Sequence, residues 1–302
     1  MFAPPIIKDR LKVMNDPLNQ NLKVLLPENI AQKLERALAQ LPKGKTVKIE
    51  EPTQWEAAFN YVLLITIAEE RYVFRARRDN SLEGINAYLK RMYENTGFLE
   101  IGGKFKLRTI AEEIDFISRA LTVGLPVPKL IKADTDWMLI EYIEGKLFHE
   151  LLEAGQVEIL IKVLRELNLA HRQGIIYGDR WGKNEIIDSQ GNVRLIDFEI
   201  EWSQEEDDNR VLEDLEMAFT IFSSLRQTRS HDELLKIIQT DAMPMLKAEG
   251  YRISRMRQFI AGFSKYYLDP NKPSDTWTIP SDLYVPIAKA ANRLIAIFAE
   301  VE

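Results

Sequence analysis

The hydrophobic pattern changes its period at Gly145, and this change limits the chain to a mixed fold. Before Gly145, short runs such as 60–68 and 71–77 are rich in β-branched and aromatic residues, which is typical of strands. After it, apolar residues recur at helical spacing, most clearly over 157–174. The pattern therefore predicts an α+β, bilobal chain in which a small β-rich lobe precedes a larger helical lobe.

The predicted organisation has three parts. An amphipathic helix expected over 28–41 is long enough to cover the apolar face of the strand at 71–77. In chains with two lobes, a cleft between the lobes is a common place for a ligand. The three parts are an N-terminal arm and helix at 1–44, an N-lobe with its hinge at 45–145, and a helical C-lobe at 146–302.

Composition excludes several kinds of chemistry. The 302 residues contain no cysteine, so disulfides, zinc thiolate sites and cysteine nucleophiles are ruled out. A net charge of −6 argues against a bulk electrostatic grip on nucleic acid or membrane. The longest apolar runs, such as 61–68, fall short of a bilayer span, and the first residues lack a signal-peptide pattern. These features predict a cytoplasmic protein.

Three polar side chains stand beside the ends of apolar runs in "YGDRWGKNEIIDSQGNVRLIDFE" (177–199). Asn184 follows Asp179 by five residues, and Asp197 follows Asn184 by thirteen. Carboxylate and amide oxygens suit Mg²⁺, which keeps waters and phosphate oxygens as its other ligands. Phosphoryl transfer needs little more than positioning and charge neutralisation. The alternative is three surface turn residues, because Asp and Asn favour turns.

The D-x-x-x-x-N spacing followed by D-F-E resembles the catalytic and metal-binding loops of the protein-kinase-like superfamily. "AHRQGIIYGDRWGKNEIID" resembles the loop of its atypical members, the aminoglycoside phosphotransferases, RIO kinases and the small kinase of the KEOPS complex. "IDFE" resembles choline kinases and aminoglycoside phosphotransferases, while "RTIAEEIDFISRALTVGLPVPKLI" resembles the KEOPS-type kinase. The resemblance covers about residues 60–220 and implies a bilobal fold that binds ATP and Mg²⁺.

The resemblance also implies roles for the loop residues. Asp179 would accept or orient the hydroxyl of the acceptor, and Asn184 and Asp197 would hold Mg²⁺. Lys183, beside Asn184, is placed to reach a phosphate, although a solvated lysine fits the same position. Loops supported by rigid elements are where catalytic groups tend to lie.

The strand "YVFRAR" departs from the family, because it offers arginines where a lysine should meet the nucleotide phosphates. Arg75 fits that position best, but Arg77 has the same parity and points to the same face of the strand. Arginine keeps the charge and binds phosphate through two donors. Glu112 is the expected acidic partner of the strand, and its neighbour Glu113 is the alternative.

The nucleotide base has its own expected contact. "MLIEYIEG" resembles a kinase hinge, so backbone groups of Glu141, Tyr142 and Ile143 would meet the adenine. Two further departures concern the loops: residues 45–70 contain no glycine with which to close over phosphates, and Tyr177 stands where histidine is usual.

Three other features have mainly structural interpretations. His171 continues an apolar helical stripe and is expected to be a core residue. Asp214 resembles a buried helix aspartate that steadies the catalytic loop. Residues 199–216 hold nine acids against one arginine, which indicates a solvated acidic face or, alternatively, a dock for a cationic acceptor.

The favoured function is an atypical ATP- and Mg²⁺-dependent phosphotransferase with a hydroxyl acceptor, either a protein or a small molecule, including a cationic one. The missing lysine and glycine loop support an alternative, a pseudokinase that binds nucleotide or acts as a scaffold. A third hypothesis is a partner within an RNA-modifying or ribosome-associated assembly. Direct nucleic-acid binding would require Arg71, Arg75, Arg77 and Arg78 to form a basic patch.

Overall fold

The chain divides into two compact units, each described here by itself. Unit 1 comprises residues 1–82, 108–122 and 127–143, and unit 2 comprises 83–107, 123–126 and 144–302. The segment 83–107, placed in the N-lobe by the sequence analysis, therefore groups with unit 2. The computed structural model describes residues 26–41, 47–50, 60–77, 82–204, 209–271, 279 and 281–300. The start of the N-terminal arm, Arg78 and the acids at 205–208 lie outside these residues.

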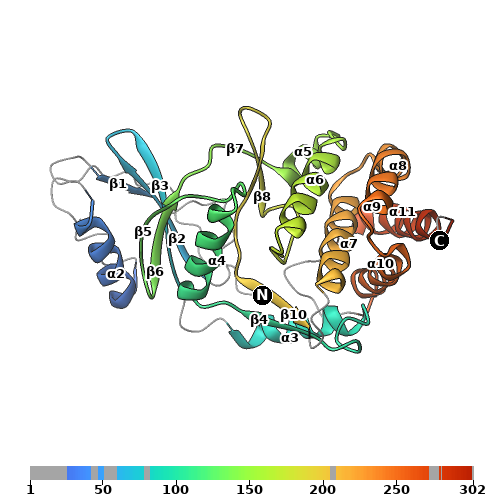
Figure 1. The fold of residues 1–302 in the computed structure, drawn as a ribbon, viewed down its shortest axis with the longest axis horizontal. Coiled ribbons are helices and arrows are strands. Elements are labelled where there is room, and N and C mark those ends of the chain that lie inside the picture. The colour runs from blue at the N-terminus through green and yellow to red at the C-terminus, as the bar shows by residue number, and fades with distance from the viewer. Residues whose placement is uncertain are drawn as a thin grey trace. The chain divides into compact units, whose positions relative to one another are not determined.

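Unit 1 is built on a five-stranded sheet in which all neighbouring strands run antiparallel (Figure 1). A two-residue turn at Ala68 and Glu69, both with positive φ, joins two of the strands as a hairpin. In spatial order the strands are β1 (Val47–Glu50), β2 (Asn60–Ile67), β3 (Glu70–Arg77), β6 (Trp137–Glu141) and β5 (Leu130–Asp134).

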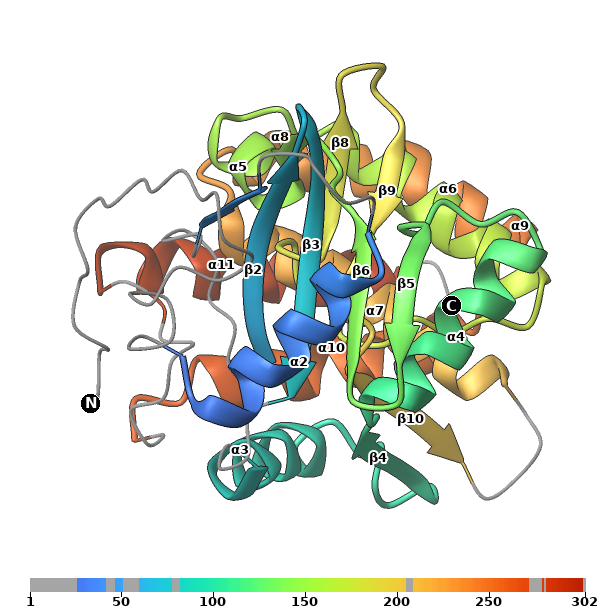
Figure 2. The ribbon, with the colours of Figure 1, turned by 90° about the vertical axis from the view of Figure 1, so that its left-hand side faces the viewer.

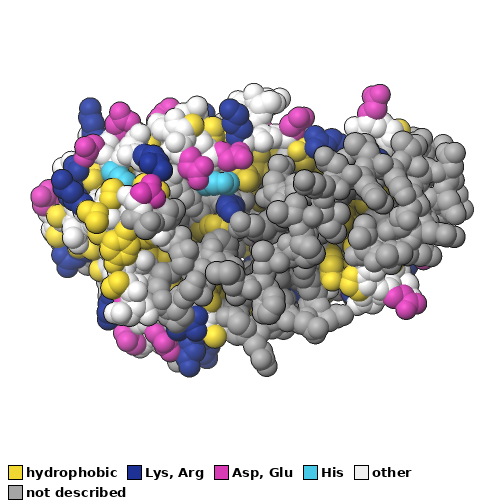
Figure 3. Space-filling model, turned by 180° about the vertical axis from the view of Figure 1, so that it is seen from behind, with side chains coloured by type: hydrophobic (Ala, Val, Ile, Leu, Met, Phe, Trp, Pro, Cys, Tyr) yellow, Lys and Arg dark blue, Asp and Glu magenta, His cyan; other side chains and the backbone are white. Residues whose placement is uncertain are grey.

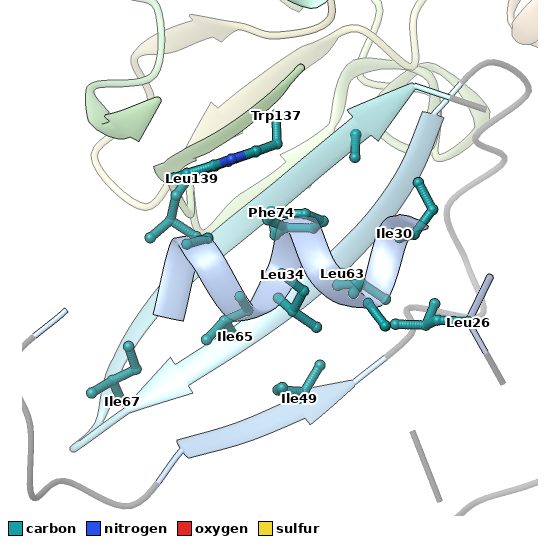
Figure 4. Close-up of a cluster of buried hydrophobic side chains, with 13 residues drawn as sticks. Leu26, Ile30, Leu34, Ile49, Leu63, Ile65, Ile67, Phe74, Trp137 and Leu139 are labelled. Atoms are coloured by element: carbon teal, nitrogen blue, oxygen red, sulfur yellow. The ribbon is translucent and has the colours of Figure 1, made fainter. Parts of the chain in front are cut away.

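Two helices lie on opposite faces of this sheet, α2 (Glu28–Ala39) on one and α4 (Ile110–Thr122) on the other (Figures 1 and 2). Ile30 and Leu34 of α2 are buried against Phe74 of β3 and Trp137 of β6, as Figure 4 shows. The prediction that the N-terminal helix covers the apolar face of the third strand is thus confirmed. The opposite face, with Arg75, is left to α4.

Unit 2 joins two small sheets to a set of helices. A ribbon pairs β4 (Gly103–Leu107) with β10 (Ile200–Gln204), and a three-stranded sheet has the order β7, β8, β9. Its strands are β7 (Gly145–Leu147), β8 (Glu185–Asp188) and β9 (Val193–Leu195). The helices are α3 (Leu82–Glu94), α5 (Phe148–Glu153), α6 (Ile159–Arg172), α7 (Arg210–Gln227), α8 (His231–Ile237), a π-helical turn η1 (Ile238–Ala242), α9 (Met243–Ala248), α10 (Ile253–Tyr267) and α11 (Ser281–Ala299).

The predicted α+β class is therefore confirmed, with a sheet-based N-terminal region and a helical C-terminal region. The glycine-containing stretch before Leu107 was not predicted as a strand, because β4 gains its regularity only by pairing with β10, almost a hundred residues away. The helical pattern at 157–174 corresponds to α6. Gly124, just after the end of α4, has φ +78°, which is typical of a glycine that caps a helix C-terminus.

The described surface mixes both signs of charge. On the face shown in Figure 3, Lys and Arg side chains are interspersed with Asp and Glu on the described atoms. Across the part of the chain that the structure describes, no helix has the length and apolar character needed to cross a membrane.

Candidate active site

The sequence-predicted site residues fall into two groups, one within each unit. Unit 1 holds the strand arginines, their acidic partner and the hinge. Unit 2 holds Asp179, Lys183, Asn184 and Asp197. Each group is built by elements of its own unit.

The strand arginines of unit 1 share one buried carboxylate. Arg75 and Arg77 both project from β3 toward α4, as their common parity predicts. An Nη2 atom of Arg77 lies 2.9 Å from Oε1 of Glu113, and Nη2 of Arg75 lies 3.5 Å from Oε2. Glu113 is fully buried and Arg75 nearly so. The group therefore places two guanidinium ions against one carboxylate inside the unit.

This pairing corrects the assignment of the strand's acidic partner to Glu112. Glu112 instead closes the N-terminus of α4, where its carboxylate accepts a hydrogen bond of 2.7 Å from the Thr109 amide. The Thr109 hydroxyl accepts one of 3.2 Å from the Glu112 amide, which completes a capping box. The next residue, Glu113, lies on the buried face of the helix and meets the arginines.

The burial of Arg75 also bears on the prediction that four arginines near the third strand could form a basic surface patch. Arg75 is 6% exposed, and Arg77 donates inward to Glu113 and to the backbone carbonyl of Arg108. The guanidinium of Arg71 stacks at 3.8 Å over the Tyr142 ring. These contacts remove Arg75 from the proposed patch, while Arg78 lies outside the described residues.

The expected hinge begins at Glu141, the last residue of β6. The amides of Glu141 and Tyr142 donate to the carbonyls of Lys129 and Arg71, at 2.9 and 3.4 Å. Among the described residues, the Ile143 amide makes no hydrogen bond. Of the three hinge amides, Ile143 is therefore the one whose donor remains for a ligand such as a purine ring.

The loop of unit 2 that carries Asp179 and Asn184, which the sequence predicts to be the catalytic loop, is anchored by helix α7. The amide of Gly178 donates a 2.5 Å hydrogen bond to Oε1 of Glu216, and Oε2 of Glu216 lies 2.7 Å from Nε2 of His171. Nδ1 of His171 lies 2.7 Å from the Tyr251 hydroxyl. His171 is buried in this chain of contacts, which confirms the prediction of a core histidine.

Other contacts of α7 correct the role expected of Asp214. Asp214 is buried in α7, but it accepts a hydrogen bond from the Arg252 amide at 3.0 Å and pairs with Arg255 at 3.3 Å. It therefore joins α7 to α10 rather than to the catalytic loop. Glu216, one half-turn later, is the residue that holds the loop, and the sequence analysis missed it.

Asp179, Asn184 and Asp197 are brought together at adjoining loops. Nδ2 of Asn184 donates to the Asp179 carbonyl at 2.8 Å, and the Asn184 carbonyl accepts from the Ile196 amide at 2.9 Å. Asp179 has φ +38° and Asp197 has φ +62°. Apart from the β2–β3 turn, these are the only non-glycine residues with positive φ in the part of the chain described. Such strain costs about 1–3 kcal/mol each and tends to cluster at functional sites.

Electrostatics at Asp179 suit proton transfer. Burial raises the pKa of the Asp179 carboxyl to about 7, with Asp197 adding to the rise and the neighbouring Arg180 opposing it. A carboxylate whose pKa lies near neutrality is well matched to act as a general base. The two acids therefore interact, which agrees with their meeting at one place.

The donor set of unit 2 fits Mg²⁺. Because the Asn184 amide nitrogen is committed to the Asp179 carbonyl, its oxygen is the atom left for a ligand. This oxygen and the Asp197 carboxylate are hard donors. The described residues hold no cluster of three or more His, Cys, Asp or Glu side chains suited to a metal. Mg²⁺ commonly binds through one or two protein oxygens and takes its remaining ligands from water and phosphate.

One further residue of the loop was not predicted. Arg180 follows Asp179 directly, and its side chain is fully buried. Its nitrogens donate to the backbone carbonyls of Gly178, Asn184, Ile196 and Asp197. Sequence reasoning had no signal for this, because a buried arginine is rare and an arginine in a loop is usually solvated.

Aromatic rings surround the same arginine. The rings of Tyr177 and Phe198 lie 5.6 Å apart, and the Arg180 guanidinium is 5.8 and 5.7 Å from their centroids. Tyr177 and Phe198 are both buried. Tyr177 thus packs against the loop as a buried structural residue.

The remaining candidates have partners within unit 2. Nζ of Lys183 lies 5.1 Å from the centroid of the Trp181 ring. Several acids of the 199–216 stretch are also engaged: Glu201 pairs with Lys106, Glu213 with Arg210 and Asp214 with Arg255. The four consecutive acids at 205–208 lie outside the described residues. The described acids thus serve internal contacts instead of forming an open acidic face.

The α+β architecture and the paired loops define the class of protein that the chain resembles, an atypical member of the protein-kinase-like superfamily. Comparison with known proteins confirms this resemblance. The chain is 37% identical over 105 residues to the KEOPS complex subunit Bud32 of Pyrococcus abyssi. It is 31% identical over 71 residues to a probable serine/threonine-protein kinase of Streptomyces coelicolor.

These matches are partial. The match to Bud32 spans 33% of this chain and 47% of that protein, and the match to the Streptomyces kinase spans 21% and 10%. No family model matches the chain. Among solved structures, the Rio2 kinase from Chaetomium thermophilum aligns with a TM-score of 0.37 and 16% identity, covering 69% of this chain and 70% of that one.

Proposed function

We propose that the chain is an ATP- and Mg²⁺-dependent phosphotransferase that moves the γ-phosphate to a hydroxyl group. The observation that carries this proposal is the pair of acids, Asp179 and Asp197, held with positive φ in adjoining loops. In the proposed reaction, Asp179 takes the proton of the acceptor hydroxyl while the oxygen of that hydroxyl bonds to the γ-phosphorus. The bond from that phosphorus to the bridging oxygen of ADP breaks, and ADP leaves.

The other residues supply charge and position. Asn184 and Asp197 are the residues that would hold Mg²⁺, which supplies charge neutralisation at the phosphate oxygens. Arg75 and Arg77 would meet phosphate with guanidinium groups that Glu113 orients. The Ile143 amide would donate to the adenine ring. The acceptor is a protein or a small molecule, and the internal contacts of Glu201 and Glu213 weaken the case for a cationic one.

One observation favours the second candidate, a pseudokinase that binds nucleotide without transfer. Arg75, the residue in the place of the expected lysine, is 6% exposed and is committed to Glu113. A guanidinium held in this way has less freedom to follow a phosphate than a lysine ammonium on its flexible stem.

The two candidates are separated by binding followed by transfer. Thermal shift with ATP should raise the Tm of the chain, and Mg²⁺ should increase that shift. Labelled γ-phosphate should then appear on an acceptor or on the protein with the wild type, but not with Asp197→Ala. Binding without transfer in the wild type would establish the pseudokinase. An unchanged Tm at all ATP and Mg²⁺ concentrations would overturn both candidates and favour a partner in an assembly.

A further inference from the structure

The backbone of Arg180 lies in the catalytic loop, which carries Asp179 and Asn184. Its guanidinium reaches the loop that carries Asp197, called the metal-binding loop after its proposed role. Its Nε atom donates to the Gly178 carbonyl at 2.5 Å, and Nη1 donates to the carbonyls of Asn184 and Ile196, each at 3.0 Å. Nη2 donates to the Asp197 carbonyl at 2.5 Å. Arginine has five N–H donors in a rigid plane, and four backbone acceptors surround this plane.

These acceptors lie on the peptide groups that flank the two strained acids. The carbonyls of Ile196 and Asp197 belong to the peptides on either side of the Asp197 α-carbon, so holding both sets the backbone rotation of that residue. The Gly178 carbonyl belongs to the peptide before Asp179. The Asn184 side chain holds the peptide after it, through its 2.8 Å bond to the Asp179 carbonyl.

The surroundings give the guanidinium little freedom. Its side chain is fully buried, the Glu185 carboxylate lies 3.7 Å from Nη1, and Glu185 is itself fixed by the Gly182 amide at 2.9 Å. The rings of Tyr177 and Phe198 lie beside it, each within 6 Å. Positive φ at non-glycine residues persists only where contacts over-determine the backbone, and Arg180 supplies such contacts on both loops.

We propose that Arg180 is a positioning residue that couples the catalytic loop to the metal-binding loop by fixing the peptides around Asp179 and Asp197. The role assigned to its side chain is to hold backbone carbonyls, and no contact with substrate or metal is assigned to it. Its effect on metal affinity rests on the proposed function, whereas its coupling of the loops does not. Lysine in its place keeps the charge but presents donors from one point, and therefore reaches fewer of the four carbonyls.

The loop coupling is tested by hydrogen–deuterium exchange on the full chain without ligand, in Arg180→Lys and in the control Arg255→Lys. Arg255 is an arginine of the same unit that pairs with Asp214 and contacts neither loop. In Arg180→Lys, peptides covering 177–185 and 195–200 should both lose protection by about tenfold. Peptides from α10 should keep theirs, and Arg255→Lys should spare both loops.

Two outcomes would overturn the coupling. Protection lost in only one of the two loops, or in neither, would show that Arg180 does not join them. Protection lost evenly across unit 2 would show that the residue contributes only to global stability. The second case is recognised by the α10 peptides, whose amides have no contact with Arg180.

The effect on metal binding has a separate readout. In thermal-shift titrations at fixed ATP, the Mg²⁺ concentration at half-saturation should rise about tenfold or more in Arg180→Lys, because residues behind metal ligands change affinity by that order. Arg255→Lys should keep the wild-type value. An unchanged midpoint in Arg180→Lys would refute this part. If wild-type protein shows no Mg²⁺ dependence, the proposed function fails while the exchange result still decides the coupling.

Discussion

Buried charges are arranged in opposite ways in the two units. In unit 1, two guanidinium groups converge on one carboxylate, so Arg75, Arg77 and Glu113 together carry one net positive charge. In unit 2, several carboxylates are buried with too few cations: burial raises the pKa values of Asp179 and Glu185 to about 7 despite Arg180 beside them. Within the Arg75, Arg77 and Glu113 group the cations therefore outnumber the carboxylate, and in the group around Arg180 the carboxylates outnumber the cation.

The contrast indicates what each group can bind. Excess guanidinium attracts an anion such as phosphate, whereas excess carboxylate with an amide oxygen attracts a hard cation. A magnesium–nucleotide complex carries both of these ions, the anionic phosphate groups and the hard cation Mg²⁺. The arrangement in each unit thus supports the proposed ligand independently, without any assumption about how the units are placed.

The largest expected effect comes from removing Asp179, the proposed proton acceptor in unit 2. Asp179→Asn keeps the shape of the side chain but cannot take a proton, so kcat should fall by about 10²–10⁴-fold. The KM for ATP should change little, because Asp179 is not assigned to nucleotide binding. The measurement is steady-state transfer of γ-phosphate, with ATP affinity from thermal shift.

Two results would contradict the role proposed for Asp179 in unit 2. A variant with near wild-type kcat would remove the role of Asp179 as base. A variant whose kcat and ATP affinity fall together would assign the residue to binding. Circular dichroism should confirm in either case that unit 2 remains folded.

Sequence reasoning predicted the fold class, and it predicted that Asp179, Asn184 and Asp197 lie close together, because both follow local rules. Strand and helix patterns repeat over several residues, and the spacing of Asp179, Asn184 and Asp197 is a local property. The placement of α2 over β3 also followed, since an apolar strand face must be covered. These parts of the structure depend mainly on periodicity and on motif spacing.

The errors arose where long-range contacts decide. Glu112 and Glu113 are adjacent acids, and only the rotation of α4 against the sheet selects Glu113 for the arginines. Asp214 and Glu216 lie two positions apart in α7. Asp214 contacts the start of α10, whereas Glu216 contacts the loop, and this difference depends on how α10 packs against α7. Arg180 is buried where four carbonyls from two loops converge on it, a contact that no local pattern reveals.

The next effect concerns the buried carboxylate of unit 1. Glu113→Gln removes the charge that balances Arg75 and Arg77, and breaking a buried ion pair costs about 3–5 kcal/mol of folding stability. The matched control is Glu112→Gln, which retains a capping group at N3 and should cost well under about 1 kcal/mol. The free energies of unfolding are measured by urea denaturation.

The order of the two variants decides between neighbouring acids. If Glu112→Gln is the more destabilising, the pairing of the arginines with Glu113 is wrong. If both cost equally little, the three charges of unit 1 are balanced by other groups, and the proposed excess of positive charge there is lost.

The smallest effect tests the excess of carboxylate in unit 2 at a residue outside the candidate site. Burial raises the pKa of Asp214 to about 7, although the Arg252 amide and Arg255 oppose the rise. An unfolded aspartate titrates near a pKa of about 3.9. Between these values the folded state binds one proton more than the unfolded state, so stability from this group falls as pH rises toward 7.

Asp214→Asn should remove that dependence, because its amide oxygen still accepts from the Arg252 amide but does not titrate. The difference in unfolding free energy, variant minus wild type, should therefore rise with pH by at most about 1.4 kcal/mol per unit between pH 5 and 7. It should level off above the folded pKa. Urea titrations at a series of pH values measure this difference directly, and Asp179 and Glu185 cancel because both proteins contain them. A difference that stays flat, or falls with pH, would mean that Arg255 keeps Asp214 ionised, and unit 2 would then balance its buried acids as unit 1 does.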